Sequence, residues 1–368
     1  MDWPPCPAEE LGVGFSDQTF GIGHGFNPVT GQFYRPCIDN PKTAEEKSGN
    51  KTETYQIKRI NSSSEIRDSL NLNAYAATFG GAYKVSSSVG KLITNGLKTD
   101  SAYFSVRVRV TGADQTISED ISISSNGKKA LAVSEAFFKK YCGDSFVSSV
   151  RGGGEFFALV TLQNVTEDQA KDFEASLQAS YGNSRIDASY KQAWEKLRTE
   201  SNLTVEISQS GALGDSMKSL TDVEGLLDYA RTFPKSLRTT GTPNAQSIIY
   251  QKYSESVAFG IALHDAKMAS FKDFDQSFRI MEEIVRAYDQ SNANVELVTD
   301  ALSNPDDFDD FVEADAQLYL QKIVNARDKL SDLAKACAEA TKEGQTAQDQ
   351  SRRFSRAVSR KAKKVGAV

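Results

Sequence analysis

The stretch FEASLQASY, residues 173–181, fits two different secondary structures. Its three largest apolar residues are four positions apart, as on one stripe of a helix. Apolar residues also stand at every second position, as on one face of a strand: Phe173, Ala175, Leu177, Ala179 and Tyr181. The turn pair Gly182-Asn183 follows, and the alternation then resumes at Ile186, Ala188 and Tyr190. The segment therefore predicts either a helix pair or an amphipathic β-hairpin.

A second segment has the same double character. The apolar residues that share one face of an extended chain are Tyr75, Phe79, Tyr83, Val85 and Val89, and most residues between them are small or polar. A membrane-spanning strand needs about 9–11 residues, with apolar side chains outward and polar ones inward. Surface helices and half-buried strands also show such patterns, so each segment taken alone fits an ordinary fold.

Three consecutive glycines, Gly152, Gly153 and Gly154, stand between the two segments and precede an apolar run, Glu155–Leu162. Glycine weakens a strand interior, because it costs backbone entropy and offers no side chain for packing. The triplet predicts either a tight turn or a bend that lets a strand twist sharply.

Composition excludes several classes of protein. The 368 residues carry a net charge of -6, and the pI is near 5.3, which argues against a general nucleic-acid binder. No apolar run approaches the ~20 residues of a transmembrane helix. The N-terminus, MDWPPCPAEELGVGF, lacks the basic start and apolar core of a secretory signal. We expect a chain that is soluble when made, with an unclear export route.

Residues suited to catalysis or metal binding are sparse. Four cysteines are spread too widely for a zinc site, and only His24 and His264 are present. No phosphate-binding loop or nucleophile elbow occurs. We therefore expect no enzyme activity, no cofactor and no metal. Cys6 and Cys37 could form a disulfide, although free thiols are the preferred interpretation.

Residues 70–125 and Leu203–Ile207 are strand-like, while 128–141 and 166–200 are helical in character. The strand signal fades after Ser216, and helices dominate the rest. We place a boundary at 255, which gives a domain of residues 1–255 and a helical C-terminal region of 256–368. That region ends in RRFSRAVSRKAKK, which includes Arg352, Arg353, Arg356 and Arg360. This tail is either a frayed helix end or a contact for anionic lipid.

The glycine region resembles a family signature. Membrane-attack-complex/perforin (MACPF) proteins carry an aromatic residue, then Gly-Thr-His-aromatic, six residues and Gly-Gly. Here Gly143-Asp144-Ser145-Phe146 is followed by six residues and Gly153-Gly154. Asp144 and Ser145 replace Thr and His, and Cys142 takes the aromatic position, with Tyr141 one place earlier. LGVGFSDQTFGIGHGFNPVTG (Leu11–Gly31) and Gly241-Thr242-Pro243 with SIIYQKY are similar to the family's opening and closing phrases. The resemblance covers residues 10–255.

The resemblance implies an α+β fold, a bent and twisted four-stranded antiparallel sheet flanked by two helical clusters. It also implies a pore-forming protein, a cytolysin, toxin or immune-type effector that assembles into a ring on a target membrane. The helical clusters would become transmembrane hairpins of a β-barrel, which satisfies every strand backbone group in lipid. The expected partners are a lipid membrane, further copies of the chain and an unknown receptor. The alternative is a non-lytic member used for adhesion or assembly.

Overall fold

A computed structural model describes residues 10–16, 18–39, 41–45, 52–80, 83, 85–182, 194–195, 197, 199, 202–211, 223–239, 244–308 and 311–346. The strands are β1 (Glu10–Gly12), β2 (His24–Asn27), β3 (Gln32–Pro36), β4 (Thr43–Glu45), β5 (Glu53–Ile60), β6 (Ser101–Ile117), β7 (Ser145–Gln163), β8 (Asn202–Ser210) and β9 (Asn244–Lys252). The helices before β9 are α1 (Ser63–Ser69), the π-helix η1 (Ala76–Gly80), α2 (Ser87–Asn95), α3 (Ser125–Val133), α4 (Glu135–Cys142), α5 (Glu167–Gly182) and α7 (Val223–Thr239). Those after β9 are η2 (Tyr253–Glu255), α8 (Val257–Asp265), α9 (Asp275–Ser303), η3 (Pro305–Asp307) and α10 (Glu313–Lys342).

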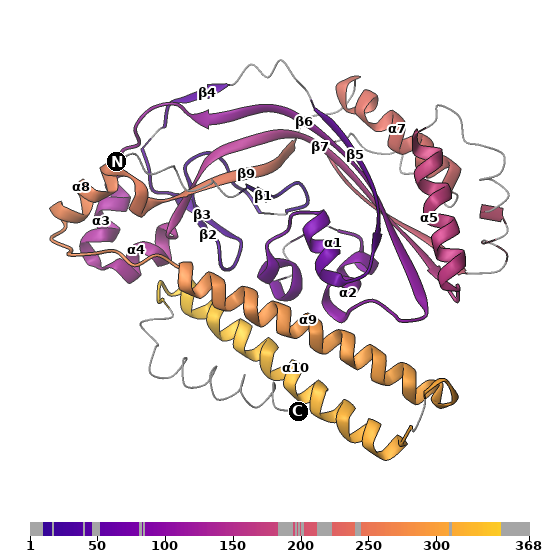
Figure 1. Cartoon of the computed structure of the whole chain (residues 1–368). Coiled ribbons are helices and arrows are strands. Elements are labelled where there is room, and N and C mark those ends of the chain that lie inside the picture. The colour runs from indigo at the N-terminus through magenta and orange to yellow at the C-terminus, as the bar shows by residue number, and fades with distance from the viewer. Residues whose placement is uncertain are drawn as a thin grey trace, which may run out of the picture.

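Strand β7 organises one antiparallel sheet. It pairs with β6 along most of its length, and its other edge pairs first with β9 and then with β8. At the β8 end the sheet is four strands wide, β5-β6-β7-β8, so that Lys58, Ser105, Leu159 and Glu206 lie in one row. Figure 1 shows β6 and β7 curving together as a long arch. The predicted fold class, a bent antiparallel sheet with helical clusters, is confirmed.

Helices cover both faces of this sheet, because neighbouring apolar residues of its strands point to opposite faces. Phe104 and Phe156 face α5 and α7 on one side. Tyr103 and Phe157 face α1 and α2 on the other. In Figure 1, α5 and α7 lie outside the arch and α1 and α2 lie within it. Both sides of the four-stranded region are therefore buried.

The C-terminal helices divide into two groups. Helix α8 packs with α3 and α4 on one apolar cluster at the β2 end of the sheet. Helices α9 and α10 form a long pair that runs below α1 and η1 (Figure 1). The predicted boundary at 255 falls at the end of η2, and it stays a prediction.

Three predictions of local structure need correction. The glycine triplet neither starts a strand nor makes a turn, because β7 runs through it from Ser145 to Gln163. Residues 76–80 and 87–95 are helical and not strand-like, since their apolar side chains pack on the sheet and on α9. A strand also forms at Asn244–Lys252, where the edges of β1 and β7 supply partners that local sequence does not reveal.

Candidate functional site

At the glycine triplet, which the sequence predicts to be the bend of the sheet, strand β7 changes partner. Residues up to Gly153 pair with β9, and residues from Glu155 pair with β8. The facing strand β6 has a register shift between Thr111 and Asp114. The triplet therefore lies at a bulge in the ladder, and the predicted role of its glycines in bending the sheet stays a prediction.

The strands approach too closely at this bend for side chains. A Cβ on Gly153, whose φ is +156°, would lie 2.1 Å from the Val110 carbonyl oxygen. A Cβ on Gly211, which directly follows β8 and has φ +83°, would lie 2.4 Å from the Gly153 carbonyl oxygen. A Cβ on Gly154 would meet Leu237 of α7 at 2.6 Å. Sequence reasoning missed Gly211, because only its contact with the triplet distinguishes it from a turn glycine.

A network of charged side chains crosses the bend. Arg107 Nε donates to Glu155 at 2.6 Å. Burial raises the pKa of Glu155, and the Arg107 guanidinium opposes this increase. Arg151 pairs with Asp114 at 2.8 Å and with Glu10 of β1 at 3.2 Å. These ion pairs join β1, β6 and β7 in the bent arrangement, and nothing in the local sequence predicted them.

Burial opposes ionisation of Glu10, yet the pKa of this carboxyl is lowered overall. The nearby Ser247 hydroxyl and the guanidinium groups of Arg109 and Arg151 favour its charged form. Arg109 donates to it at 2.9 Å. The edge strand β1 is thus held to the bend by a carboxylate between two cations.

The signature residues join four elements at the start of β7. Gly143 ends α4 with φ +77°, and a Cβ there would lie 2.3 Å from the Phe26 carbonyl oxygen of β2. Phe146 is buried, with its ring 5.1 Å from that of Tyr253. Tyr141 is half-buried and stacks on Phe137. In this chain the signature residues pack the start of β7 against β2 and η2. The roles predicted for them in bending the sheet stay predictions.

A disulfide joins Cys37 to Cys142, across 105 residues of sequence. The considered pairing of Cys6 with Cys37 is therefore wrong, and so is the preference for free thiols at Cys37. Cys337 is free and buried, and Cys6 lies outside the described residues. The bridge fastens the loop after β3 to the end of α4, since sheet pairing brings these distant segments together.

Asp144 of the signature connects β7 to the helical region. Its carboxylate accepts a hydrogen bond of 2.7 Å from the amide of Phe274, the residue before α9. Burial raises the pKa of Asp144 to about 6, although this bond and one from the Ser145 hydroxyl favour the charged form. Nearby, buried Lys139 pairs with Glu135 at 2.6 Å.

The raised pKa of Asp144 makes a testable prediction about stability. The folded chain holds this proton more tightly than the unfolded chain does. The contribution of Asp144 to the free energy of unfolding therefore falls as pH rises from about 4 to about 6, by on the order of 3 kcal/mol. Asp144→Asn removes the titration. The stability of the native chain minus that of the variant should fall across this window in denaturant melts. A difference that does not change with pH would contradict the assignment.

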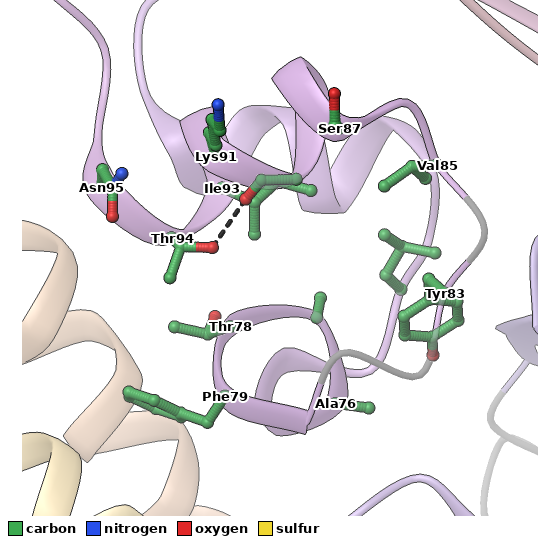
Figure 2. Close-up of a pocket in the computed structure, with 13 residues that line it drawn as sticks. Ala76, Thr78, Phe79, Tyr83, Val85, Ser87, Lys91, Ile93, Thr94 and Asn95 are labelled. Atoms are coloured by element: carbon green, nitrogen blue, oxygen red, sulfur yellow. Dashed lines mark hydrogen bonds between the residues drawn. The ribbon is translucent and has the colours of Figure 1, made fainter.

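In the ambiguous segment from Tyr75 to Val89, η1 and α2 are short helices. Tyr75 and Val89 are buried, while Phe79, Tyr83 and Val85 are half-buried. Figure 2 shows Ala76, Thr78 and Phe79 on η1 below α2, with Tyr83 and Val85 at one side. They line a largely apolar cavity of about 470 Å³. The η1 and α2 turns therefore leave a space between them, which weakens their mutual packing.

Helix α9 contacts α1, η1 and α2 and holds them against the rest of the protein. Arg67 of α1 makes two hydrogen bonds to the carboxylate of Asp289, one of them at 3.1 Å, and both side chains are largely buried. Asn292 donates to the carbonyl of Thr94 at 3.0 Å. The ring of Phe79 meets that of Tyr288 edge to face at 4.9 Å. The C-terminal region thus contacts α1, η1 and the end of α2.

The ambiguous segment that begins at Phe173 lies in helix α5. Phe173 and Leu177 are fully buried on the sheet, and the Phe173 ring lies 4.8 Å from those of Phe104 and Trp194. Ala175 and Ala179 are exposed. The predicted helix is confirmed over Glu167–Gly182. The Tyr181 side chain and residues Ile186, Ala188 and Tyr190 lie outside the described residues.

Three further features considered from the sequence are the basic tail, a metal site and a membrane-spanning helix. The basic tail with Arg352, Arg353, Arg356 and Arg360 lies outside the described residues. Within the described ranges, no group of three or more His, Cys, Asp or Glu side chains is arranged to bind a metal. None of the helices in those ranges has the length and apolar character needed to span a membrane.

Comparison with known proteins finds similar solved structures at low sequence identity. No family model and no curated protein matches the sequence. The stonustoxin structure matches 93% of this chain and 43% of its own, with 12% identity and TM-score 0.47. GNIP1Aa from Chromobacterium piscinae matches 70% and 55%, with 13% identity and TM-score 0.39. Astrotactin-2, described as a perforin-like membrane protein, matches 70% and 100%, with 11% identity and TM-score 0.37.

These structures belong to the superfamily that joins MACPF proteins and cholesterol-dependent cytolysins. The chain is thus similar in structure to members of the family that its sequence resembles. The chain spans less than half the length of the stonustoxin chain and about half that of GNIP1Aa. Because the TM-scores are below 0.5, function has to be inferred from the geometry of the chain itself.

Proposed function

We propose that this protein forms pores: copies assemble on a target membrane and convert two helical segments into transmembrane β-hairpins. The first segment, residues 61–100, contains α1, η1 and α2. The second, residues 164–201, begins with α5. Ring assembly and insertion of a β-barrel are part of the proposal, as is action at an extracellular membrane surface.

One observation carries the proposal. Both segments leave the sheet at the same end. The first connects β5 to β6 and the second connects β7 to β8, and in each case the two strands already pair with one another. Ser101 lies opposite Gln163, and Gln163 lies opposite Asn202. Ile60 lies opposite Tyr103 on the outer side. If both segments became extended, they would lengthen the four-stranded sheet β5-β6-β7-β8 without changing its register.

The segments are long enough to cross a bilayer. They contain 40 and 38 residues. A hairpin of that size has arms of about 18 residues, or roughly 60 Å at ~3.3 Å per residue. The hydrocarbon core is only ~30 Å thick. Both hairpins could therefore span the core with length to spare for a tilt and a turn.

The helical arrangement also hides the apolar side chains that insertion needs. Phe173 and Leu177 face the sheet, and Tyr75 and Val89 face the interior. An extended arrangement would place Ala175 and Ala179 on the same face as Phe173, which the helix does not. A chain with its lipid-facing residues covered in this way avoids an exposed apolar patch before it meets a membrane.

Site-specific labelling tests this conversion. An environment-sensitive dye is attached to single cysteines at each position of 173–181, with Cys6 and Cys337 replaced by alanine. Before vesicles are added, the signal should follow helical burial, with Ala175 and Ala179 in water. After addition it should alternate with a period of two, because odd positions face lipid and even ones face the lumen.

Release of a trapped dye from the same vesicles shows whether the conversion makes pores, and electron microscopy shows whether rings form. Alternation together with leakage supports the proposal. A helical pattern that persists on membranes, with no leakage, would contradict it. Binding without leakage would favour the non-lytic alternative, in which the fold serves adhesion or assembly.

A further inference from the structure

The far end of the α9–α10 pair exposes apolar side chains. We call residues 296–308 and 311–319 the hairpin tip. On it, Leu297, Val312 and Leu318 are each more than half exposed, and Tyr319 is 39% exposed. Phe308 and Phe311 lie beside them, with ring centroids 6.5 Å apart. In Figure 1 this end of the pair points away from α3, α4 and α8. Such a surface is typical of a contact for a partner.

The charge of the hairpin tip indicates which partner. Residues 296–318 include eight acidic side chains and no basic one. Among the described residues, Asp300, Glu313 and Asp315 form no ion pair with a basic side chain. The tail, residues 352–364, has the opposite composition: seven basic residues, no acidic one, and apolar Phe354 and Val358. The two segments are complementary both in charge and in apolar content.

Distance keeps the first part of the tail from the acidic start of α10 in its own chain. The end of α10 is fixed at α4, because Lys140 pairs with Glu343 at 2.6 Å and Gly344 packs on the Ala136 carbonyl. The 30 residues of α10 separate that end from the tip by about 45 Å. Arg352 follows Lys342 by ten residues, and these span at most ~36 Å even when fully extended. The first basic residues of the tail therefore fall short of Glu313 in their own chain, and only the tip of a second copy can receive the whole tail.

We propose that the basic tail of one copy binds the hairpin tip of a second copy. The exposed leucines would receive Phe354 and Val358, while the arginines meet Asp300, Glu313 and Asp315. The contact joins two different surfaces, so each copy keeps one free tip and one free tail. Such a head-to-tail contact builds chains, and it closes into a ring where the rotation allows. The contact deepens the proposed ring assembly but does not need a membrane in order to form.

Sedimentation velocity of the full chain tests the contact. At about 0.01 M salt, where charges act over ~30 Å, the chain should self-associate, and at about 1 M salt, where they act over ~3 Å, it should become monomeric. A chain that ends at residue 346 should stay monomeric in both. The triple variant Asp300→Asn, Glu313→Gln, Asp315→Asn should associate about tenfold more weakly, because three exposed ion pairs are lost.

A matched control separates the contact from net charge. Glu283→Gln, Asp328→Asn and Asp332→Asn remove three exposed acids from the same helices outside the tip. This variant should associate as the native chain does. Thermal melts check that both triple variants fold. Equal weakening by the two variants would overturn the proposal, because it would indicate a general charge effect.

Mixing two defective chains gives the decisive result. The chain that ends at residue 346 offers a tip but no tail, and the tip variant offers a tail but no acidic tip. At a concentration where the native chain is about half associated, each alone should be mostly monomeric, and an equimolar mixture should form dimers that do not grow further. A mixture that remains monomeric would overturn the proposal. So would a full chain that is monomeric at low salt while its tail binds vesicles of equal parts phosphatidylserine and phosphatidylcholine, the lipid contact considered from the sequence.

Discussion

A disulfide between residues 96 and 292 should abolish dye leakage from vesicles until it is reduced. A Cβ built on Gly96, at the end of α2, lies 3.3 Å from the Cβ of Asn292 on α9. A disulfide needs about 3.5–4.5 Å between these atoms. Gly96→Cys with Asn292→Cys would thus tie the first segment to α9 with little movement. The segment could not leave the body, so no first hairpin would form.

The controls must separate the lock from two side effects. Gly96 has φ +98° and Asn292 donates to Thr94, so each substitution has its own cost. The two single-cysteine variants should still release dye, at the rate of the native chain or more slowly. Reductant also opens the Cys37–Cys142 bridge, so the native chain is measured with and without it. Free leakage by the oxidised double variant would show that the first segment does not convert.

The sequence predicted this chain best where local pattern and tertiary contacts agree. The i, i+4 spacing of Phe173 and Leu177 predicted a helix, and both residues do pack on the sheet. The same spacing failed to decide for residues 74–95, because their aromatic residues also fit a strand. There the partners decide: Tyr288 and Met281 of α9 cover Tyr75 and Phe79, and they lie some two hundred residues away in the sequence.

The features that sequence reasoning missed are those made by long-range pairing. Cys37 meets Cys142 only because β2 and α4 both pack against the start of β7. Arg107 meets Glu155 because they lie on neighbouring strands two rows apart in register. Neither relation leaves a periodic signal in the sequence. The glycine triplet is visible in the sequence, but its structural role depends on the change of partner from β9 to β8 that occurs there.

Replacement of Gly153 by alanine should destabilise the fold more than any other single methyl group added near the bend. The new Cβ would lie 2.1 Å from the Val110 carbonyl oxygen, which belongs to the backbone of β6. The backbone at φ +156° is also open mainly to glycine. A strained conformation costs about 1–3 kcal/mol, and overpacking adds a further ~1–3 kcal/mol. We expect the free energy of unfolding to fall by several kcal/mol in denaturant melts.

Two other glycines complete the comparison. At Gly154 the new Cβ would meet the methyl groups of Leu237 at 2.6 Å. A leucine side chain can move, so Gly154→Ala should cost only about 1–3 kcal/mol. At Gly260, inside α8, the Cβ would meet nothing within 4 Å, so alanine should stabilise the helix by ~0.5–1 kcal/mol. Equal stability of the Gly153 and Gly260 variants would mean that β6 can shift away from β7. The bend would then tolerate side chains, and close approach of the strands would not be the reason for glycine.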